Sequence, residues 1–190
     1  MRFDRLVTPR LVLRRWQPAD LDPFTALNAD PEVMQHFPST YDRAATASMI
    51  ASWEDKIDRQ GFGLWAVERA EDGMFLGMAG LNPVPPGIIA GAGLEIGWRL
   101  ARHAWGHGYA TEAGQAAIDV ARRMKARSVW SFTSVDNQRS QAVMRRLGLG
   151  FVRNFDHPNI PDGDPTRPHV LYVLDLAGAW PALEVRQANR

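Results

Sequence analysis

The chain has 190 residues, of which 45% are hydrophobic and 23% are charged, and its formal net charge is +1. This composition is typical of a globular protein with its own core, and the balanced charge argues against a general affinity for nucleic acid or an anionic membrane. The sequence contains no cysteine, which excludes disulfides, thiolate metal sites and a cysteine nucleophile. No apolar run has the ~20 residues needed to span a bilayer, and the N-terminus lacks a signal-peptide pattern, so we expect a cytoplasmic protein.

The first half of the sequence alternates strand and helix signals. A short apolar run at 11–13 predicts a strand, and residues 20–29 predict a helix, after which Asp30-Pro31 begins another. From Asp42 onward, apolar residues recur at helical spacing until Gly61. Two strands at 62–68 and 74–81 follow, joined by an Asp-Gly turn that is typical of a hairpin.

The second half repeats the alternation. We expect strands at 94–100, 128–134, 151–155 and 169–176, and helices at 111–125 and 137–147. A loop rich in Pro, Gly and Asp occupies 156–167. Neither a repeat nor a long linker divides the chain, so the sequence predicts one α/β domain over 8–176 and a C-terminal tail over 177–190.

The segment 94–113 carries the strongest functional signal. A predicted strand leads into a turn with Gly106 and Gly108, and the turn leads into a helix. Glycines let the backbone approach a bulky anion, and the free N–H groups of a helix N-terminus bind it. A turn without a ligand is the simpler alternative. Two known phosphate loops are excluded, because a dinucleotide fingerprint needs glycine where Thr111 stands and no Gly-Lys-Ser/Thr sequence exists.

The sequence Trp105-Gly-His-Gly-Tyr-Ala-Thr-Glu-Ala113 resembles the pyrophosphate-binding motif of the GNAT family of N-acetyltransferases. It is most similar to the ribosomal-protein acetyltransferases of the RimJ/RimL type. Trp105 stands at the first position of the motif, where the wider family has Gln or Arg, and a Trp there resembles this branch. Segments 8–14, 63–67, 75–81 and 136–148 resemble other parts of that branch in the same order. The sequence departs at Leu147-Gly-Leu-Gly-Phe151, where the family has Leu-Gly-Phe, and this leaves the register of the next strand open.

This resemblance implies an α/β GNAT fold, with a central mixed, mostly antiparallel sheet of about seven strands and helices on both faces. It implies an enzyme that moves the acetyl group of acetyl-CoA to a primary amine, without a metal. The acceptor stays open between a protein N-terminus, slightly favoured by the branch, and a small-molecule amine such as an amino acid or an antibiotic. A homodimer is expected on the same basis.

The resemblance also assigns residues to coenzyme A. The backbone of Trp98, Arg99 and Leu100 would bind the pantetheine arm. The amides of the turn would hold the pyrophosphate; these belong to Gly106, His107, Gly108, Tyr109 and Ala110. His103 or Arg102 would reach a phosphate, and Thr111 would either contact phosphate or cap the helix. Asn137 would contact coenzyme A, and its alternative role is a helix N-cap.

Catalysis requires a neutral amine, and an α-amine lies only about 1 pKa unit above pH 7, whereas a lysine lies about 3.4 units above. Glu95 is the first candidate for the base, because strand alternation places it on one face with Gly97 and Arg99. Asp156 and His169 are alternatives. Ser140 would hydrogen-bond the departing sulfur. A local splay of the sheet near Glu95–Trp98 would bring thioester and amine together, with backbone N–H groups stabilising the oxyanion.

Other classes of function fit less well. His103 and His107 are four residues apart but lack the His-Glu-x-x-His pattern of a zinc site, and no Gly-x-Ser-x-Gly elbow of a serine hydrolase occurs. The serious alternative is a regulatory module that binds acyl-CoA without turnover. The aromatic residues Trp16, Phe37, Trp65 and Trp98 are candidates either for an apolar acceptor pocket or for the core.

Overall fold

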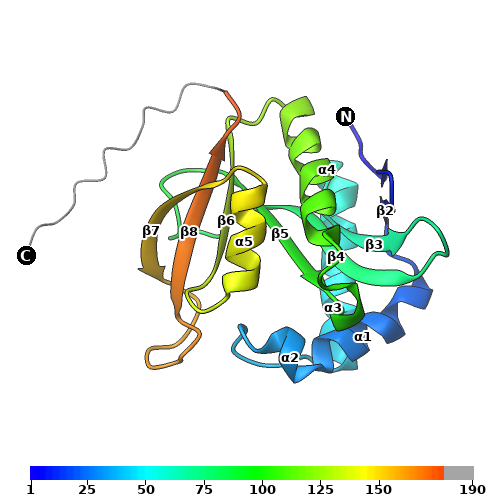
Figure 1. The fold of residues 1–190 in the computed structure, drawn as a ribbon, viewed down its shortest axis with the longest axis horizontal. Helices are drawn as coiled ribbons and strands as arrows, with labels where there is room; N and C mark the ends of the chain where they lie inside the picture. The colour runs from blue at the N-terminus through cyan, green and yellow to red at the C-terminus, as the bar shows by residue number, and fades with distance from the viewer. Residues whose placement is uncertain (178–190) are drawn as a thin grey trace, which may run out of the picture.

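One mixed sheet organises the chain in the computed structural model, which describes residues 1–177 (Figure 1). Its eight strands lie in the order β1-β2-β3-β4-β5-β6-β8-β7, and only β5 and β6 are parallel neighbours. The strands are β1 (Arg5–Val7), β2 (Leu11–Arg14), β3 (Leu64–Arg69), β4 (Phe75–Pro83), β5 (Leu94–Leu100), β6 (Ser128–Ser134), β7 (Gly150–Asp156) and β8 (Pro168–Asp175). The sequence predicted seven of them and missed β1, an edge strand of three residues. Apart from Ala177, the predicted tail lies outside the described residues.

Helices cover both faces of the sheet. They are α1 (Leu21–Ala29), α2 (Pro31–Met34), α3 (Arg43–Gln60), α4 (Tyr109–Arg123) and α5 (Gln138–Arg146), with short 3₁₀ turns η1 (Pro18–Asp20) and η2 (Arg102–Ala104). Figure 1 shows α4 and α5 in front of the sheet and α3 behind it. In residues 1–177, no helix has both the length and the apolar character required to cross a bilayer.

The predicted helix ends on the α3 side are confirmed by their caps. The Asp42 carboxylate accepts a hydrogen bond from the Ala45 N–H at 2.8 Å, and Gly61 ends α3 in the left-handed conformation. The Asp30 carboxylate caps α2. Helix α4 begins at Tyr109, two residues before the predicted start, because Gly108 and not Thr111 is its N-cap. Thr111 therefore does not cap the helix.

Each face of the sheet has its own hydrophobic core. The α4 face contains Trp65, Ile96 and Ile118, and the α3 face contains Trp16, Phe24 and Trp53. Trp16 donates through Nε1 to the Leu64 carbonyl at 2.8 Å, and Trp65 donates to the Phe3 carbonyl at 2.9 Å. Trp16 and Trp65 are thus core residues, and a role in lining an acceptor pocket is wrong for both.

Strands β5 and β6 separate soon after they meet. Their ladder consists of Leu94 with Val129 and Glu95 with Trp130, whereas β6 pairs with β8 along its whole length. On its other side, β5 pairs with β4 from Leu94 to Leu100. One edge of β5 therefore leaves the ladder beyond Glu95, at the position where the sequence predicted a splay.

The departure at 147–151 is accommodated at the end of α5. The N–H of Gly148 donates to the Arg145 carbonyl and that of Leu149 to the Met144 carbonyl, both at 3.0 Å, which is a Schellman motif. Buried Leu149 packs beneath this end, and β7 then pairs with β8 through a bulge between Phe151 and Arg153. The extra residues thus close the helix and shift the register locally.

Candidate active site

The glycine turn before α4 presents a run of free backbone donors. Gly106 and Gly108 have φ values of 81° and 79°, which favour glycine. A Cβ on Gly106 would meet nothing within 4 Å, and one on Gly108 would meet only Arg10 Nη2 at 3.6 Å. Within residues 1–177, none of the backbone N–H groups from Gly106 to Thr111 donates a hydrogen bond. The turn therefore offers an open, donor-rich surface at the positive end of a 15-residue helix.

Arg10 fixes this turn from the opposite end of the sequence. Its Nη1 donates to the His107 carbonyl at 3.0 Å, and its Nε and Nη2 bind the Glu112 carboxylate at 2.7 and 2.6 Å. Thr8 Oγ1 donates to the same carboxylate at 2.6 Å. Burial opposes ionisation of Glu112, but these hydrogen bonds outweigh it and lower its pKa. Arg10 and Thr8 could not be predicted as residues of the site from local sequence, because their partner Glu112 lies about a hundred residues away.

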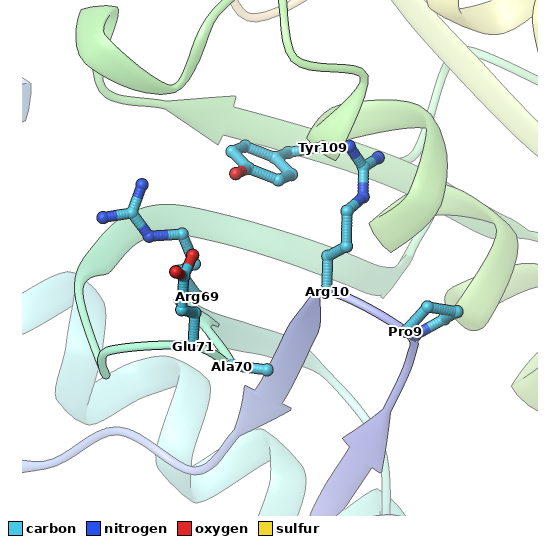
Figure 2. Close-up of a pocket in the computed structure, with 6 residues that line it drawn as sticks. All are labelled: Pro9, Arg10, Arg69, Ala70, Glu71 and Tyr109. Atoms are coloured by element: carbon cyan, nitrogen blue, oxygen red, sulfur yellow. The ribbon is translucent and has the colours of Figure 1, made fainter.

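A shallow cavity lies on the outer side of the turn. It has a volume of about 390 Å³ and is lined by Pro9, Arg10, Arg69, Ala70, Glu71 and Tyr109. Figure 2 shows Arg10 and Tyr109 on one side of it and Arg69 on the other. Both arginines already bind carboxylates, Glu112 and Asp72, and no lining residue comes from β5 or β6. This cavity is therefore separate from the fork of the sheet.

The remaining predicted coenzyme A residues before the helix surround the turn. Trp105 donates through Nε1 to the Leu100 carbonyl at 2.8 Å, so this carbonyl of the β5 edge already has one partner. His107 stacks on Tyr109, with ring centroids 5.5 Å apart, and His103 is exposed in η2. Arg102 pairs with Glu32 at 3.1 Å. No group of three or more His, Asp or Glu residues within 1–177 is arranged to hold a metal ion.

Asn137 and Ser140 lie at the start of α5. The Asn137 Oδ1 accepts from the Ser140 N–H at 3.1 Å, and its Nδ2 donates to Thr133 Oγ1 at 2.9 Å. Asn137 is therefore the N-cap, and its amide already has partners on both sides. The Ser140 hydroxyl is half-buried and makes no hydrogen bond within the described residues.

Glu95 lies at the point where β5 leaves β6, on the face toward α1–α3. Its carboxylate is close to Gly97, whose Cβ would lie 3.8 Å from Glu95 Oε1. Burial raises its pKa to about 8, against an opposing effect of the Lys56 charge. The Lys56 ammonium itself donates to Asn82 Oδ1 at 3.2 Å, and Asn82 is the β4 partner of Glu95. A buried carboxyl with a pKa near neutrality has the properties of a general base.

The two alternative bases are less suited to that role. Asp156 has a side chain 66% exposed, 3.8 Å from Arg167. His169 is buried on β8, its Nδ1 lies 3.0 Å from the Arg167 carbonyl, and burial lowers its pKa. Its ring is 4.9 Å from that of His157, in an aromatic cluster with Phe132. Because Phe132 is two residues beyond Trp130 on β6, this cluster shares the Glu95 face across the fork.

A groove opens next to these elements. It has a volume of about 750 Å³ and runs between α1–α2 and the segment Ala101–Trp105. Its lining combines apolar Leu27 and Val33 with charged Asp30, Glu32 and Arg102. The groove thus lies beside the glycine turn on the face that also carries Glu95.

Comparison with known proteins agrees with this geometry. Residues 10–150 match the family model described as an acetyltransferase (GNAT) domain. The uncharacterized protein YkkB of Bacillus subtilis is 30% identical over 160 residues, which are 83% of this chain and 91% of YkkB. A crystal structure of an acetyltransferase from Agrobacterium tumefaciens has a TM-score of 0.73 and 27% identity, covering 92% of this chain and 95% of its own.

The fold is also that of RimL, a ribosomal alpha-N-protein acetyltransferase solved in complex with coenzyme A. That structure has a TM-score of 0.72 and 19% identity, and covers 90% of this chain and 96% of its own. GNAT acetyltransferases use acetyl-CoA as the acetyl donor. The glycine turn, the forked sheet and the family match over 10–150 lead to one conclusion: the chain belongs to the GNAT family and is an N-acetyltransferase.

Proposed function

We propose that this enzyme transfers the acetyl group from acetyl-CoA directly to a primary amine while both substrates are bound, with Glu95 as the base. The observation that carries this proposal is the fork between β5 and β6. At the fork, a buried carboxyl of raised pKa lies where the free edge of β5 begins. The glycine turn follows at the other end of the same strand.

The residues of the turn and strand fit acetyl-CoA. The unpaired N–H groups from Gly106 to Thr111 suit a pyrophosphate, and Gly106 leaves open space for it. The Ala101 N–H donates to Leu76 on β4, so strand alternation points the backbone groups of Trp98 toward the fork. There they suit the amides of a pantetheine arm. The side chain of Asn137 would keep its cap while contacting coenzyme A from the α5 side.

The bound thioester supplies an activated acetyl carbon. Glu95 in its ionised form takes the proton of the incoming ammonium, directly or through a water, and releases it to solvent. The neutral nitrogen then forms the new C–N bond as the C–S bond breaks, and it gives its second proton to Glu95 while the departing thiolate takes up one proton from solvent. The proton on Glu95 then returns to solvent. The Ser140 hydroxyl is free to donate a hydrogen bond to the departing sulfur, which stabilises the thiolate until it is protonated.

The identity of the amine belongs to the proposal as well. Likeness to RimL slightly favours a protein N-terminal α-amine over a small-molecule amine, and this rests on shared fold alone. The expected homodimer and the cytoplasmic location stay predictions.

Calorimetric titration with acetyl-CoA tests the donor site. We expect binding at one site per chain, and loss of binding in Gly108→Trp, because the indole would cover the turn. Gly73→Trp is the matched control, since Gly73 has a similar φ of 75° and also faces open space, but lies in the β3–β4 hairpin. If acetyl-CoA binds neither protein, or binds Gly108→Trp as well as the wild type, the assignment of the turn is wrong.

An acetyltransfer assay over a panel of amines tests the chemistry. We expect Glu95→Gln to lower kcat about 100-fold or more and Ser140→Ala to lower it about tenfold. The difference is expected because a general base accelerates the reaction more than a single hydrogen bond to the sulfur does. Tight acetyl-CoA binding without acetyl consumption over the whole panel would instead support a non-catalytic module that binds acyl-CoA.

A further inference from the structure

Arg99 is a partly buried cation on the acceptor side of the fork, and its Nε is buried. It follows Glu95 by four residues on β5, so both side chains leave the same face. Its Nη1 donates to Asn28 Oδ1 at 2.6 Å, and its guanidinium carbon lies 4.4 Å from the ring centroid of Phe37 and 5.8 Å from that of Tyr41. The Tyr41 N–H donates to the Asn28 carbonyl at 3.0 Å, which fixes this cover over the strand.

This guanidinium has no carboxylate partner within residues 1–177. The acidic residues at the start of α2 are paired elsewhere, since Glu32 and the N-cap Asp30 pair with Arg102. Burial lowers the pKa of Arg99 to about 10 against an opposing effect of Tyr41, no carboxylate contributes, and the guanidinium stays charged at neutral pH. Arg14, which is also largely buried, shows the usual arrangement, with Asp20 and Glu68 both at 2.7 Å. A buried charge without such a partner is costly for the fold.

The unused donors of Arg99 define the shape of the missing partner. Its Nε is the one buried side-chain nitrogen or oxygen in the described part of the chain without a hydrogen-bond partner. Asn28 uses one N–H of Nη1, and the free donors include Nε–H and the neighbouring N–H of Nη2, which lie side by side on one edge of the guanidinium. This edge matches the two oxygens of one carboxylate. A phosphate would call for further cationic donors beside Arg99, whereas Lys56 on this face acts on Glu95 and donates to Asn82.

The position of Arg99 relates this edge to the reaction. Four strand residues span about 13 Å. The Glu95 carboxylate and the Arg99 guanidinium thus lie at two ends of one strand face, beneath α1 and the segment that leads to α3. A molecule whose amine lies near Glu95 can extend along β5 and place an anionic end on Arg99.

We propose that the acceptor is a small amine that also carries a carboxylate, of the amino-acid type, and that Arg99 binds this carboxylate through Nε–H and Nη2–H. This inference rests on the proposed function and names the acceptor class for the same site. It selects small carboxylated amines over protein N-termini, since the unpartnered Nε–H beneath Phe37 and Tyr41 lacks a carboxylate, and a free carboxylate is what such an amine brings.

The test compares matched acceptors. A series of ω-amino acids of increasing length is assayed beside their carboxamides, and rates are compared per neutral amine, because loss of the carboxylate charge lowers the amine pKa in the short members. We expect the carboxylates to have kcat/KM about 10- to 100-fold higher at the best length, as a lower KM, because charged hydrogen bonds of this kind contribute that much. Peptides with neutral N-terminal residues are included as the competing class.

Two variants connect the preference to Arg99. In Arg99→Gln the ratio of carboxylate to carboxamide should fall to about one. In Asn28→Asp the new carboxylate would pair with Arg99 from within, and the ratio should fall in the same way while the arginine remains. Thr46 Oγ1, now 3.2 Å from Asn28 Nδ2, can reverse its hydrogen bond to donate to Asp. Asn28→Asp thus keeps the test decisive should Arg99→Gln fail to fold, and we expect it to melt higher than the wild type.

Calorimetry of the same acceptors on protein saturated with coenzyme A gives a second readout that needs no turnover. Three results would overturn the inference. They are equal affinity for carboxylates and carboxamides, a preference for carboxylates that survives in both variants, and selective acetylation of the neutral peptides. Each of these results leaves the proposed acetyltransfer intact, whereas failure of the proposed function shows separately, as loss of acetyl-CoA binding or of turnover with every amine.

Discussion

Glu95 shows how a single side chain acquires its chemistry from its surroundings. An isolated glutamate is ionised at neutral pH and is a weak base. At the head of the fork, burial raises its pKa to about 8, and Lys56 limits the rise. A proton taken from an ammonium is therefore held with an affinity close to that of an α-amine, which suits a base that must bind and release it in each cycle.

The pH dependence of turnover follows from this value. With an acceptor amine of low pKa, which is already neutral, we expect kcat/KM to rise about tenfold per pH unit below about pH 8 and to level off above it. Glu95→Gln should abolish the rise of kcat/KM with pH and should also remove most of the rate. A wild-type profile that is flat from pH 6 to 9 with such an acceptor would rule out Glu95 as the base.

The same pKa predicts an effect on stability. The folded state holds a proton on Glu95 up to about pH 8, whereas the unfolded chain releases it near 4.5, so the folded protein binds more protons between these values. Wild-type stability should therefore fall, relative to Glu95→Gln, as the pH rises from about 5 to 8. Thermal melts of both proteins across this range measure the difference. A constant difference would show that Glu95 ionises at its ordinary pKa.

At the scale of elements, the glycine turn depends on a contact between two distant segments. The first turn of α4 carries Glu112, and the start of β2 brings Arg10 against it and against the His107 carbonyl. The helix dipole favours an acid at this end, and the Arg10 contact holds the turn in the conformation that leaves its N–H groups free. Arg10 is thus a positioning residue for the turn.

Loss of this contact should weaken acetyl-CoA binding. We expect Arg10→Ala to raise the Kd for acetyl-CoA about five- to tenfold, because the turn becomes mobile, while stability falls by about 1 kcal/mol, as is usual for a partly exposed ion pair. Arg122→Ala is the control, since Arg122 forms an exposed pair with Asp119 at the opposite end of α4. Calorimetry gives the Kd and urea unfolding the stability. Equal Kd values for Arg10→Ala and the control would show that the turn holds its shape unaided.

At the scale of the whole molecule, the forked sheet places both substrates. Seven residues of β5 are paired with residues of β4, and beyond Glu95 the strand is not paired with β6. One edge is thus left for a ligand, while β6, β8 and β7 form a second wall with their own pairings.

Hydrogen exchange measures this arrangement. In the free protein, the amide of Trp98 should exchange much faster than that of Arg99, because alternation points Trp98 toward the fork and Arg99 toward β4. Saturation with acetyl-CoA should slow exchange at Trp98 and leave Arg99 protected. Unchanged exchange at Trp98 in the saturated protein would mean that the donor does not bind along β5.

Local patterns in the sequence determined most of the elements. The cap at Asp42, the stop at Gly61 and the glycine turn are set by residues within a few positions of each other, so they can be predicted without the fold. The motif at 105–113 and its companions indicated the family, which the match over 10–150 confirms. The placement of Glu95 and Arg99 on one face followed from strand alternation.

Only the tertiary structure decided the rest. Strand β1 is held by its pairing with β2, and three residues carry too little pattern to be predicted alone. The anchor from Arg10, the raised pKa of Glu95 and the unpartnered Nε of Arg99 all depend on what distant segments bring near. The burial of a side chain and its charged partners are determined only when the elements pack together, because packing, and not the neighbouring residues in the chain, excludes solvent.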